Sequence, residues 1–247
     1  MARNKNFLLS TDTIIFDLDG TLLESMGVWN EIDRILIHEL GGPWEEEMMV
    51  GKRRDALLAR FSGMENPYGE YCGALGRIYG SSLSKEEILA LRHTIDKDFL
   101  GTRVDYKPGA VELIKRLHDL GKTLIIATTT KRPNITIYRT ENRNIMDKAP
   151  LDDYFAAIYT REDVKAIKPS PEVHERILHD LHKKREECFI LEDSLSGILA
   201  ARAAGIPVGA VYDRYSADDK EKIQALSDCW YDSLDDAVKE LDTLLTN

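Results

Sequence analysis

Five short apolar runs that do not alternate with polar residues constrain the fold of this chain most strongly. A run of this kind is typical of a strand covered on both faces, as in a parallel sheet. The runs lie at residues 14–16, 124–127, 156–159, 189–191 and 208–211. Helical patterns separate most of them, at residues 108–121, 171–184 and 195–204. Strands that alternate with helices predict an α/β fold with a doubly wound parallel sheet.

Residues 25–104 differ from the rest of the chain, because no stretch there has the pattern of a strand. Apolar residues recur instead at the spacing of a helical face, as at Val28, Ile32, Ile35, Leu36 and Leu40. Ser84 and Glu87 match a capping box in front of another such pattern. We therefore predict an α/β core, made of residues 1–24 and 105–247, that is interrupted by a helical domain at residues 25–104.

The composition excludes several classes of protein. The chain has 33 basic and 43 acidic side chains, and its net charge of −10 argues against a protein that coats nucleic acid or an anionic membrane. It leaves room for a small anionic substrate, which needs only a local basic cluster. Three widely separated cysteines make no disulfide framework, and the apolar run at residues 7–9 is too short for a signal peptide. No run reaches membrane-spanning length, so we expect a cytoplasmic protein without nucleic-acid or membrane partners.

Two carboxylates follow the first predicted strand. Asp17 and Asp19 start on the same side of the extended chain, which then turns at Gly20. Ligands of open α/β sheets bind beyond the carboxyl ends of the strands. Carboxylates this close repel one another unless a cation lies between them, and Mg²⁺ prefers such oxygen ligands. A carboxylate can also act as a nucleophile, whereas the plain alternative is an Asx turn that ends a strand.

Three further motifs occur at the ends of later strands or the starts of helices. Thr128 and Thr129 follow the second apolar run and suit phosphate oxygens, although threonine is also common at helix caps. Lys168 precedes a predicted helix and can bind phosphate as a point charge, or it is a solvated surface residue. Glu192 and Asp193 end another strand and could simply be an acidic helix start. Each motif alone is weak, but their order along the chain favours one shared site.

These motifs resemble those of the haloacid dehalogenase-like (HAD) hydrolase superfamily, in the branch near β-phosphoglucomutase and small phosphosugar phosphatases. The matching stretches are IIFDLDGTLLES at 14–25, TLIIATTTK at 123–131, KPSPEVHERIL at 168–178 and CFILEDSLSGILAARAAGIP at 188–207. The first and the last are highly specific. The resemblance implies a Rossmann-like core and an inserted helical cap that closes over a small phosphorylated metabolite. A monomer or a weak dimer is expected.

The resemblance also implies a role for each matching residue. Asp17 would be the nucleophile and a Mg²⁺ ligand. Asp19 would protonate the leaving alcohol and then activate water, while its backbone carbonyl binds the metal. Lys168 would neutralise the charge of the phosphoryl group. Asp193 would be a further metal ligand, and Glu192 would bind the metal directly or through water.

The remaining matched residues are assigned to the substrate. Thr128, or its neighbour Thr129, would hold the phosphoryl oxygens, and Gly20 belongs to the same phosphoryl site. Arg54 in the helical domain follows Gly51 at the spacing of a family arginine that contacts substrate, although a solvated basic turn is equally compatible with it.

Two departures from the family pattern bear on function. Trp29 stands where the mutase has a histidine, which argues against mutase activity, and residues 132–150 are longer and more polar than expected. That segment could shape the hinge or a contact surface. The sequence thus predicts a Mg²⁺-dependent phosphatase of a sugar or polyol phosphate that works through an aspartyl-phosphate. The alternatives are a β-phosphoglucomutase-like mutase and a non-catalytic regulator.

Overall fold

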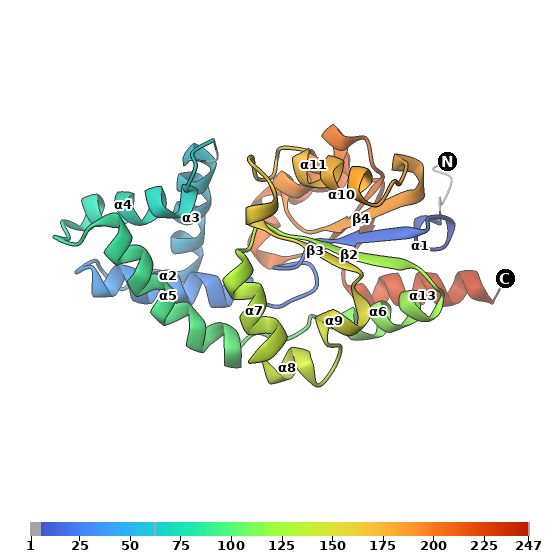
Figure 1. The fold of residues 1–247 in the computed structure, drawn as a ribbon, viewed down its shortest axis with the longest axis horizontal. Coiled ribbons are helices and arrows are strands. Elements are labelled where there is room, and N and C mark those ends of the chain that lie inside the picture. The colour runs from blue at the N-terminus through green and yellow to red at the C-terminus, as the bar shows by residue number, and fades with distance from the viewer. Residues whose placement is uncertain (1–5, 62, 247) are drawn as a thin grey trace. The chain divides into compact units, whose positions relative to one another are not determined.

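A computed structural model describes residues 6–61 and 63–246 of the chain (Figure 1). The chain divides into two compact units. The first unit contains Met1–Glu24 and Asp105–Asn247, and the second contains Ser25–Val104. The polar motifs that end the predicted strands all belong to the first unit.

A six-stranded parallel sheet forms the centre of the first unit and confirms the predicted fold class. Its order is β3-β2-β1-β4-β5-β6, and every neighbouring pair is parallel. The strands are β1 (Thr13–Phe16), β2 (Thr123–Ala127), β3 (Ala157–Tyr159), β4 (Cys188–Glu192), β5 (Val208–Val211) and β6 (Cys229–Tyr231). The chain builds outward from β1 to β3 and then returns to place β4 on the other side of β1. The strand order therefore reverses between β1 and β4, where open α/β sheets bind their ligands.

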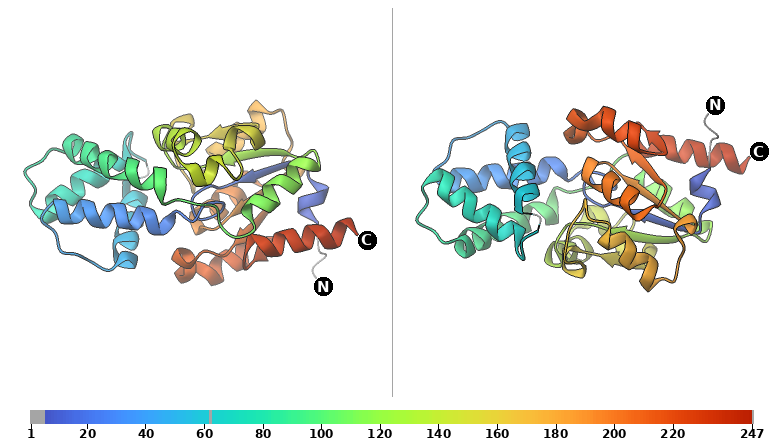
Figure 2. Two further views of the ribbon diagram at one scale, coloured as in Figure 1. Left: turned by 90° about the horizontal axis from the view of Figure 1, so that it is seen from below. Right: turned by 90° about the horizontal axis from the view of Figure 1, so that it is seen from above.

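Helices cover both faces of this sheet, as Figures 1 and 2 show. In the view of Figure 1, α10 (Glu172–Asp180) and α11 (Leu195–Ala204) lie above the sheet, and α6 (Ala110–Asp119) and α13 (Leu234–Leu245) lie below it. The burial explains the unbroken apolar runs, because all residues of β1, β4 and β5 are buried. The shorter elements are α1 (Phe7–Ser10), α12 (Lys220–Leu226), η1 (Arg161–Asp163), η2 (Arg185–Glu187) and η3 (Arg214–Asp219).

Two details of the first unit differ from the prediction. The edge strand β6 was not predicted, because its residues Cys229–Tyr231 include no aliphatic side chain and lie between two aspartates. The helix expected at residues 171–184 ends earlier, at Asp180. His182 follows that end with a φ of 53°, so it does not share the helix with His174 and His179.

The long polar segment after β2 folds into three short helices. These are α7 (Arg132–Thr140), α8 (Arg143–Met146) and α9 (Leu151–Tyr154). The Tyr106 hydroxyl donates a hydrogen bond to the Ala149 carbonyl at 2.5 Å, and the Lys148 ammonium pairs with Asp105. The segment is therefore bonded to the chain immediately after the point where the second unit ends.

The second unit is helical, and none of residues 25–61 and 63–104 forms a strand. Its helices are α2 (Met26–Glu39), α3 (Glu47–Phe61), α4 (Pro67–Tyr79) and α5 (Lys85–Thr102). The predicted capping box starts α5, where Ser84 and Glu87 exchange hydrogen bonds. The helices pack around a shared apolar cluster that includes Leu36, Tyr71 and Ile88.

Among the helices of the described residues, none combines the length and the apolar character that crossing a bilayer requires.

Candidate active site

Three carboxylates gather where β1 and β4 end. Asp17 directly follows β1, Glu192 is the last residue of β4, and Asp193 comes next. One oxygen atom from each carboxylate lies within 4.8 Å of the others. All three residues are buried, with exposed fractions of 8%, 1% and 4%. The cluster thus occupies the carboxyl edge of the sheet at the point where the strand order reverses.

The ammonium group of Lys168 joins two of these carboxylates. Its Nζ donates to Asp17 Oδ1 and to Glu192 Oε1, both at 2.6 Å, and to the carbonyl of Ala127 at 2.8 Å. A lysine ammonium has three donor hydrogens, and these three acceptors use all of them. Lys168 is therefore a fixed, buried charge beside Asp17.

The second oxygen of Glu192 is held by the start of α11. Oε2 accepts hydrogen bonds at 3.0 Å from the backbone N–H groups of Asp193 and Ser194. A side chain at position 197 would collide with the Glu192 carboxylate, so glycine is required there. Both oxygens of Glu192 thus have donors, and its orientation is determined before any ligand binds.

Burial makes the negative charge of this cluster costly. It raises the pKa of Asp17 to about 7, with Glu192 adding to the effect and Lys168 opposing it. Burial and the charge of Glu192 also raise the pKa of Asp193 well above its ordinary value. Burial lowers the pKa of Lys168, but the charges of Asp17 and Glu192 outweigh this and leave it above its usual range. One ammonium therefore does not compensate the three carboxylates.

The donor set fits a divalent cation with a preference for oxygen ligands. When all three carboxylates are ionised, the cluster with Lys168 carries two excess negative charges in a buried place, which is unfavourable without a further positive charge. The Thr21 hydroxyl donates to Asp193 Oδ1 at 2.7 Å and holds that carboxylate in place. Mg²⁺ prefers such carboxylate oxygens, so the residues present fit the metal that the sequence predicts.

The threonine motif lies beside Asp19 rather than among the three carboxylates. Thr128 is buried, and its hydroxyl accepts a hydrogen bond from the backbone N–H of Thr130 at 3.0 Å. The Thr130 hydroxyl in turn donates to Asp19 Oδ2 at 2.5 Å. Thr129, between them, is half-buried. The Asp19 side chain is not a member of the carboxylate cluster, and the sequence assigned only its backbone carbonyl to the metal.

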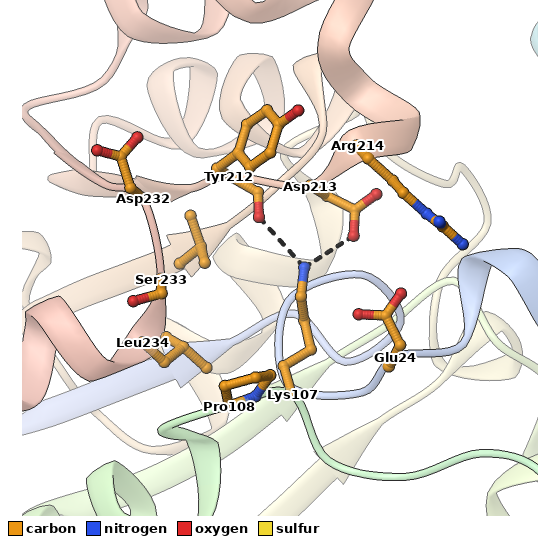
Figure 3. Close-up of a pocket in the computed structure, with 10 residues that line it drawn as sticks. Glu24, Lys107, Pro108, Tyr212, Asp213, Arg214, Asp232, Ser233 and Leu234 are labelled. Atoms are coloured by element: carbon orange, nitrogen blue, oxygen red, sulfur yellow. Dashed lines mark hydrogen bonds and ion pairs between the residues drawn. The ribbon is translucent and has the colours of Figure 1, made fainter.

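A lysine outside the predicted motifs holds the turn after Asp19. Lys107 Nζ donates to the carbonyl of Gly20 at 2.7 Å. It also donates to Asp213 Oδ2 at 2.7 Å and to the carbonyl of Tyr212 at 3.2 Å (Figure 3). These residues line or adjoin a cavity of about 520 Å³ at the ends of β5 and β6. Gly20 has a φ of 94°, and a Cβ there would clash with the Asp193 carboxylate. The turn is thus shaped by the absence of a side chain and by the lysine.

Arg54 belongs to the other unit, where it is buried among polar side chains. Its Nη1 is 3.4 Å from Asp33 Oδ2, and its Nε is 3.3 Å from Asp55 Oδ1. Arg92 Nε donates to the other oxygen of Asp33 at 2.7 Å. Arg54 is therefore buried in a helix and does not belong to a solvated basic turn. Its contact with substrate stays a prediction.

The sequence did not single out four residues that the structure places at or next to the site. Thr130 and Tyr138 both donate to Asp19, and Lys107 and Asp213 form the ion pair beside Gly20. The run of three threonines was a signal for Thr130. The contacts of Tyr138 and Lys107 with the site join residues at least 87 positions apart, and no local sequence pattern indicates them.

The comparisons with known proteins agree on one family. A family model described as haloacid dehalogenase-like hydrolase matches residues 14–211. The chain is 30% identical over 212 residues to protein CbbY of Rhodobacter capsulatus, covering 83% of this chain and 87% of that one. It is 26% identical over 195 residues to the phosphorylated carbohydrates phosphatase of Thermotoga maritima, covering 79% and 82%.

A solved structure shares the fold. The crystal structure of CbbY from Rhodobacter sphaeroides in complex with phosphate matches with a TM-score of 0.70 and 24% identity, covering 91% of this chain and 95% of that one. The matched family region contains β2 to β5, all of β1 except Thr13, and all three clustered carboxylates. The chain therefore belongs to the haloacid dehalogenase-like hydrolase family, in its phosphosugar phosphatase branch.

Proposed function

We propose that this protein is a Mg²⁺-dependent phosphatase that hydrolyses a small phosphorylated metabolite, a sugar or polyol phosphate, through an aspartyl-phosphate. The observation that carries the proposal is the buried cluster of Asp17, Glu192 and Asp193 with Lys168 bonded between two of its members. The similarity to a phosphorylated carbohydrates phosphatase supports the substrate class.

Each residue of the cluster has a distinct part in the proposed site. Asp17, Asp193 and the backbone carbonyl of Asp19 would hold Mg²⁺, and Glu192 would hold it directly or through water. The metal, when bound, supplies positive charge to the phosphoryl oxygens. Lys168 adds a second fixed positive charge, and Thr128 with Thr129 binds the remaining oxygens. Phosphoryl transfer depends mainly on such positioning and charge compensation.

The first proposed step moves the phosphoryl group to the protein. A carboxylate oxygen of Asp17 forms a bond to phosphorus, and the bond between phosphorus and the leaving oxygen breaks with its electron pair on that oxygen. The protonated Asp19 carboxyl gives its proton to the leaving oxygen, which departs as an alcohol. Asp19 is thereby left as a carboxylate.

The second step returns the protein to its starting state. A water molecule attacks phosphorus and gives a proton to the Asp19 carboxylate. The bond between phosphorus and Asp17 breaks, its electron pair stays on the aspartate, and inorganic phosphate leaves. The role of Ser25–Val104 as a cap that excludes bulk water during these steps remains a prediction.

The test is turnover of a panel of sugar and polyol phosphates, measured as phosphate release with Mg²⁺ and with EDTA. We expect release that depends on Mg²⁺ and that Asp17→Asn abolishes. Asp119→Asn, whose side chain is 82% exposed, is the control and should keep full activity. Asp193→Asn should shift the Mg²⁺ titration to higher concentration.

The same panel separates the alternatives. Incubation with β-glucose 1-phosphate gives free phosphate if the protein is a phosphatase and glucose 6-phosphate if it is a mutase. Absence of Mg²⁺-supported turnover of the whole panel and of p-nitrophenyl phosphate would identify a non-catalytic regulator. Wild-type activity in Asp17→Asn would contradict the nucleophile assignment.

A further inference from the structure

One side chain of the segment that follows the threonine motif contacts the candidate active site. Helix α7 (Arg132–Thr140) buries Asn134, Ile135, Ile137 and Tyr138. Tyr138 is fully buried and is among the largest buried side chains of the protein. Its hydroxyl donates to Asp19 Oδ1 at 3.1 Å. A segment that had no role in the sequence pattern therefore contacts the residue proposed for proton transfer.

Two hydroxyl groups hold the two oxygens of the Asp19 carboxylate. Thr130 donates to Oδ2 at 2.5 Å, and Tyr138 donates to Oδ1. The three residues come from three elements: the turn after β1, the loop after β2, and α7. These two donors, one on each oxygen, restrict rotation about both side-chain torsions of the aspartate.

Neighbouring residues fix the position of Thr130, whose hydroxyl donates to Asp19. The backbone N–H of Thr130 donates to the Thr128 hydroxyl at 3.0 Å, and Thr128 N–H donates to the carbonyl of Tyr159 at the end of β3. The tyrosine ring is held by burial in α7. Both hydroxyl groups thus sit on rigid supports, which is what a precisely placed acid–base group requires.

We propose that Tyr138 is a positioning residue, whose hydroxyl works with that of Thr130 to hold the Asp19 carboxyl where it can pass a proton to the leaving oxygen. This inference rests on the proposed function of Asp19 as the acid and base. A proton moves efficiently only between atoms within hydrogen-bond reach. Removing one of two supports therefore slows leaving-group departure without removing the nucleophile, the lysine or the carboxylate cluster.

The leaving group provides a readout that a merely structural role would not change. An alkyl phosphate, such as glycerol 3-phosphate, needs a proton on its departing oxygen, whereas p-nitrophenolate leaves readily without one. The kcat/KM reports the steps up to departure of the leaving group. The ratio of kcat/KM for the alkyl phosphate to that for p-nitrophenyl phosphate therefore measures the acid's contribution.

The variants are Tyr138→Phe, which deletes one oxygen atom and keeps the ring, and Asp19→Asn as the reference for complete loss of the acid. Tyr159→Phe is the matched control, because its hydroxyl contacts Asp180 at 3.3 Å on the side of α10. The alkyl substrate is whichever sugar or polyol phosphate the wild type turns over fastest. Thermal unfolding of each variant checks that the fold is retained.

We expect Tyr138→Phe to lower the ratio by about tenfold, a fraction of the 10²–10⁴-fold contribution of a full acid–base group. Asp19→Asn should lower it further, and Tyr159→Phe should leave it unchanged. Equal losses on both substrates, or an unchanged or raised ratio in Tyr138→Phe, would overturn the inference while leaving the phosphatase intact. A wild type that hydrolyses neither substrate overturns the proposed function and this inference together. An Asp19→Asn variant without leaving-group dependence removes Asp19 as the acid and the inference with it.

Discussion

The buried carboxylate of Asp17 should make the metal-free protein less stable as the pH rises. Its pKa is raised from 3.8 to about 7 in the folded state. Between these values the folded protein keeps a proton that the unfolded chain has released. The free energy of unfolding therefore falls as the pH rises through this window. Asp17→Asn has no such proton to lose, and its amide oxygen can still accept a hydrogen bond from Lys168.

The size of this change in the free energy of unfolding follows from the pKa shift of Asp17. A change of about three pH units, from 3.8 to about 7, corresponds to about 4 kcal/mol at about 1.4 kcal/mol per unit. That is a large part of the ~5–15 kcal/mol that stabilises a typical domain. We expect Asp17→Asn to match the wild type near pH 4 and to exceed its stability by up to about 4 kcal/mol at pH 8. The substitution that abolishes activity would thus stabilise the fold.

The assay is urea unfolding in EDTA at pH 4.5, 6, 7 and 8, with wild type and variant compared at each pH. Titration of groups that the Asp17 charge does not shift, such as His174, is the same in both proteins and cancels in the difference. Added Mg²⁺ should restore about 2.7 kcal/mol to the wild type at 100 times its Kd, and less to the variant. A stability difference that does not change with pH, or a variant less stable than wild type at pH 8, would refute the reasoning.

Three further predictions concern buried groups. His174 is fully buried, and burial with nearby Lys168 lowers its pKa to about 3, so lowering the pH from 6.5 to 4.5 should cost the wild type about 2 kcal/mol relative to His174→Leu in urea unfolding. Lys107→Met frees the Gly20 carbonyl and should lower kcat/KM by up to about 10²-fold in phosphate-release assays. Asp33→Asn leaves the buried Arg92 guanidinium poorly compensated and should cost about 3 kcal/mol in urea unfolding.

Each of these predictions has a control on the same kind of element. His179 lies on the same helix as His174, but its side chain is 84% exposed. The variant His179→Gln should therefore keep the wild-type dependence of the unfolding free energy on pH. Lys148→Met removes an exposed ion pair to Asp105 and should keep full kcat/KM. Glu31→Gln on α2 breaks only a partly exposed pair and should cost under about 1 kcal/mol. Equal effects in a variant and its control would contradict the corresponding prediction.

The sequence predicted the sheet because parallel strands leave a local signature. Unbroken apolar runs identified β1 to β5, since both faces of those strands are covered. The edge strand β6 carries no such signature, because its residues Cys229–Tyr231 include no aliphatic side chain and lie between two aspartates. The helix containing His174 was predicted too long, because a φ of 53° at His182 is decided by the turn and not by the apolar spacing.

The site was predictable where its residues follow strands or, like Lys168, belong to a motif at the start of a helix. Asp17, Glu192 and Asp193 each come at the end of a strand, so the shared carboxyl edge of a parallel sheet brings them together. Tyr138 and Lys107 reach the same region from a helix and from the chain after the second unit. Their contacts depend on how distant segments fold back, and one sequence alone does not contain that information. The catalytic roles of all these residues remain predictions.

The second unit leaves the core and returns to it at nearly one point. The backbone N–H of Glu24 donates to the carbonyl of Asp105 at 2.8 Å, and Leu23 pairs with Tyr106 in an antiparallel bridge. An insertion point of this kind accepts another domain whose N- and C-termini lie close together, because every strand of the sheet lies outside the inserted residues. The second unit can therefore be exchanged at this point without interrupting any strand of the sheet.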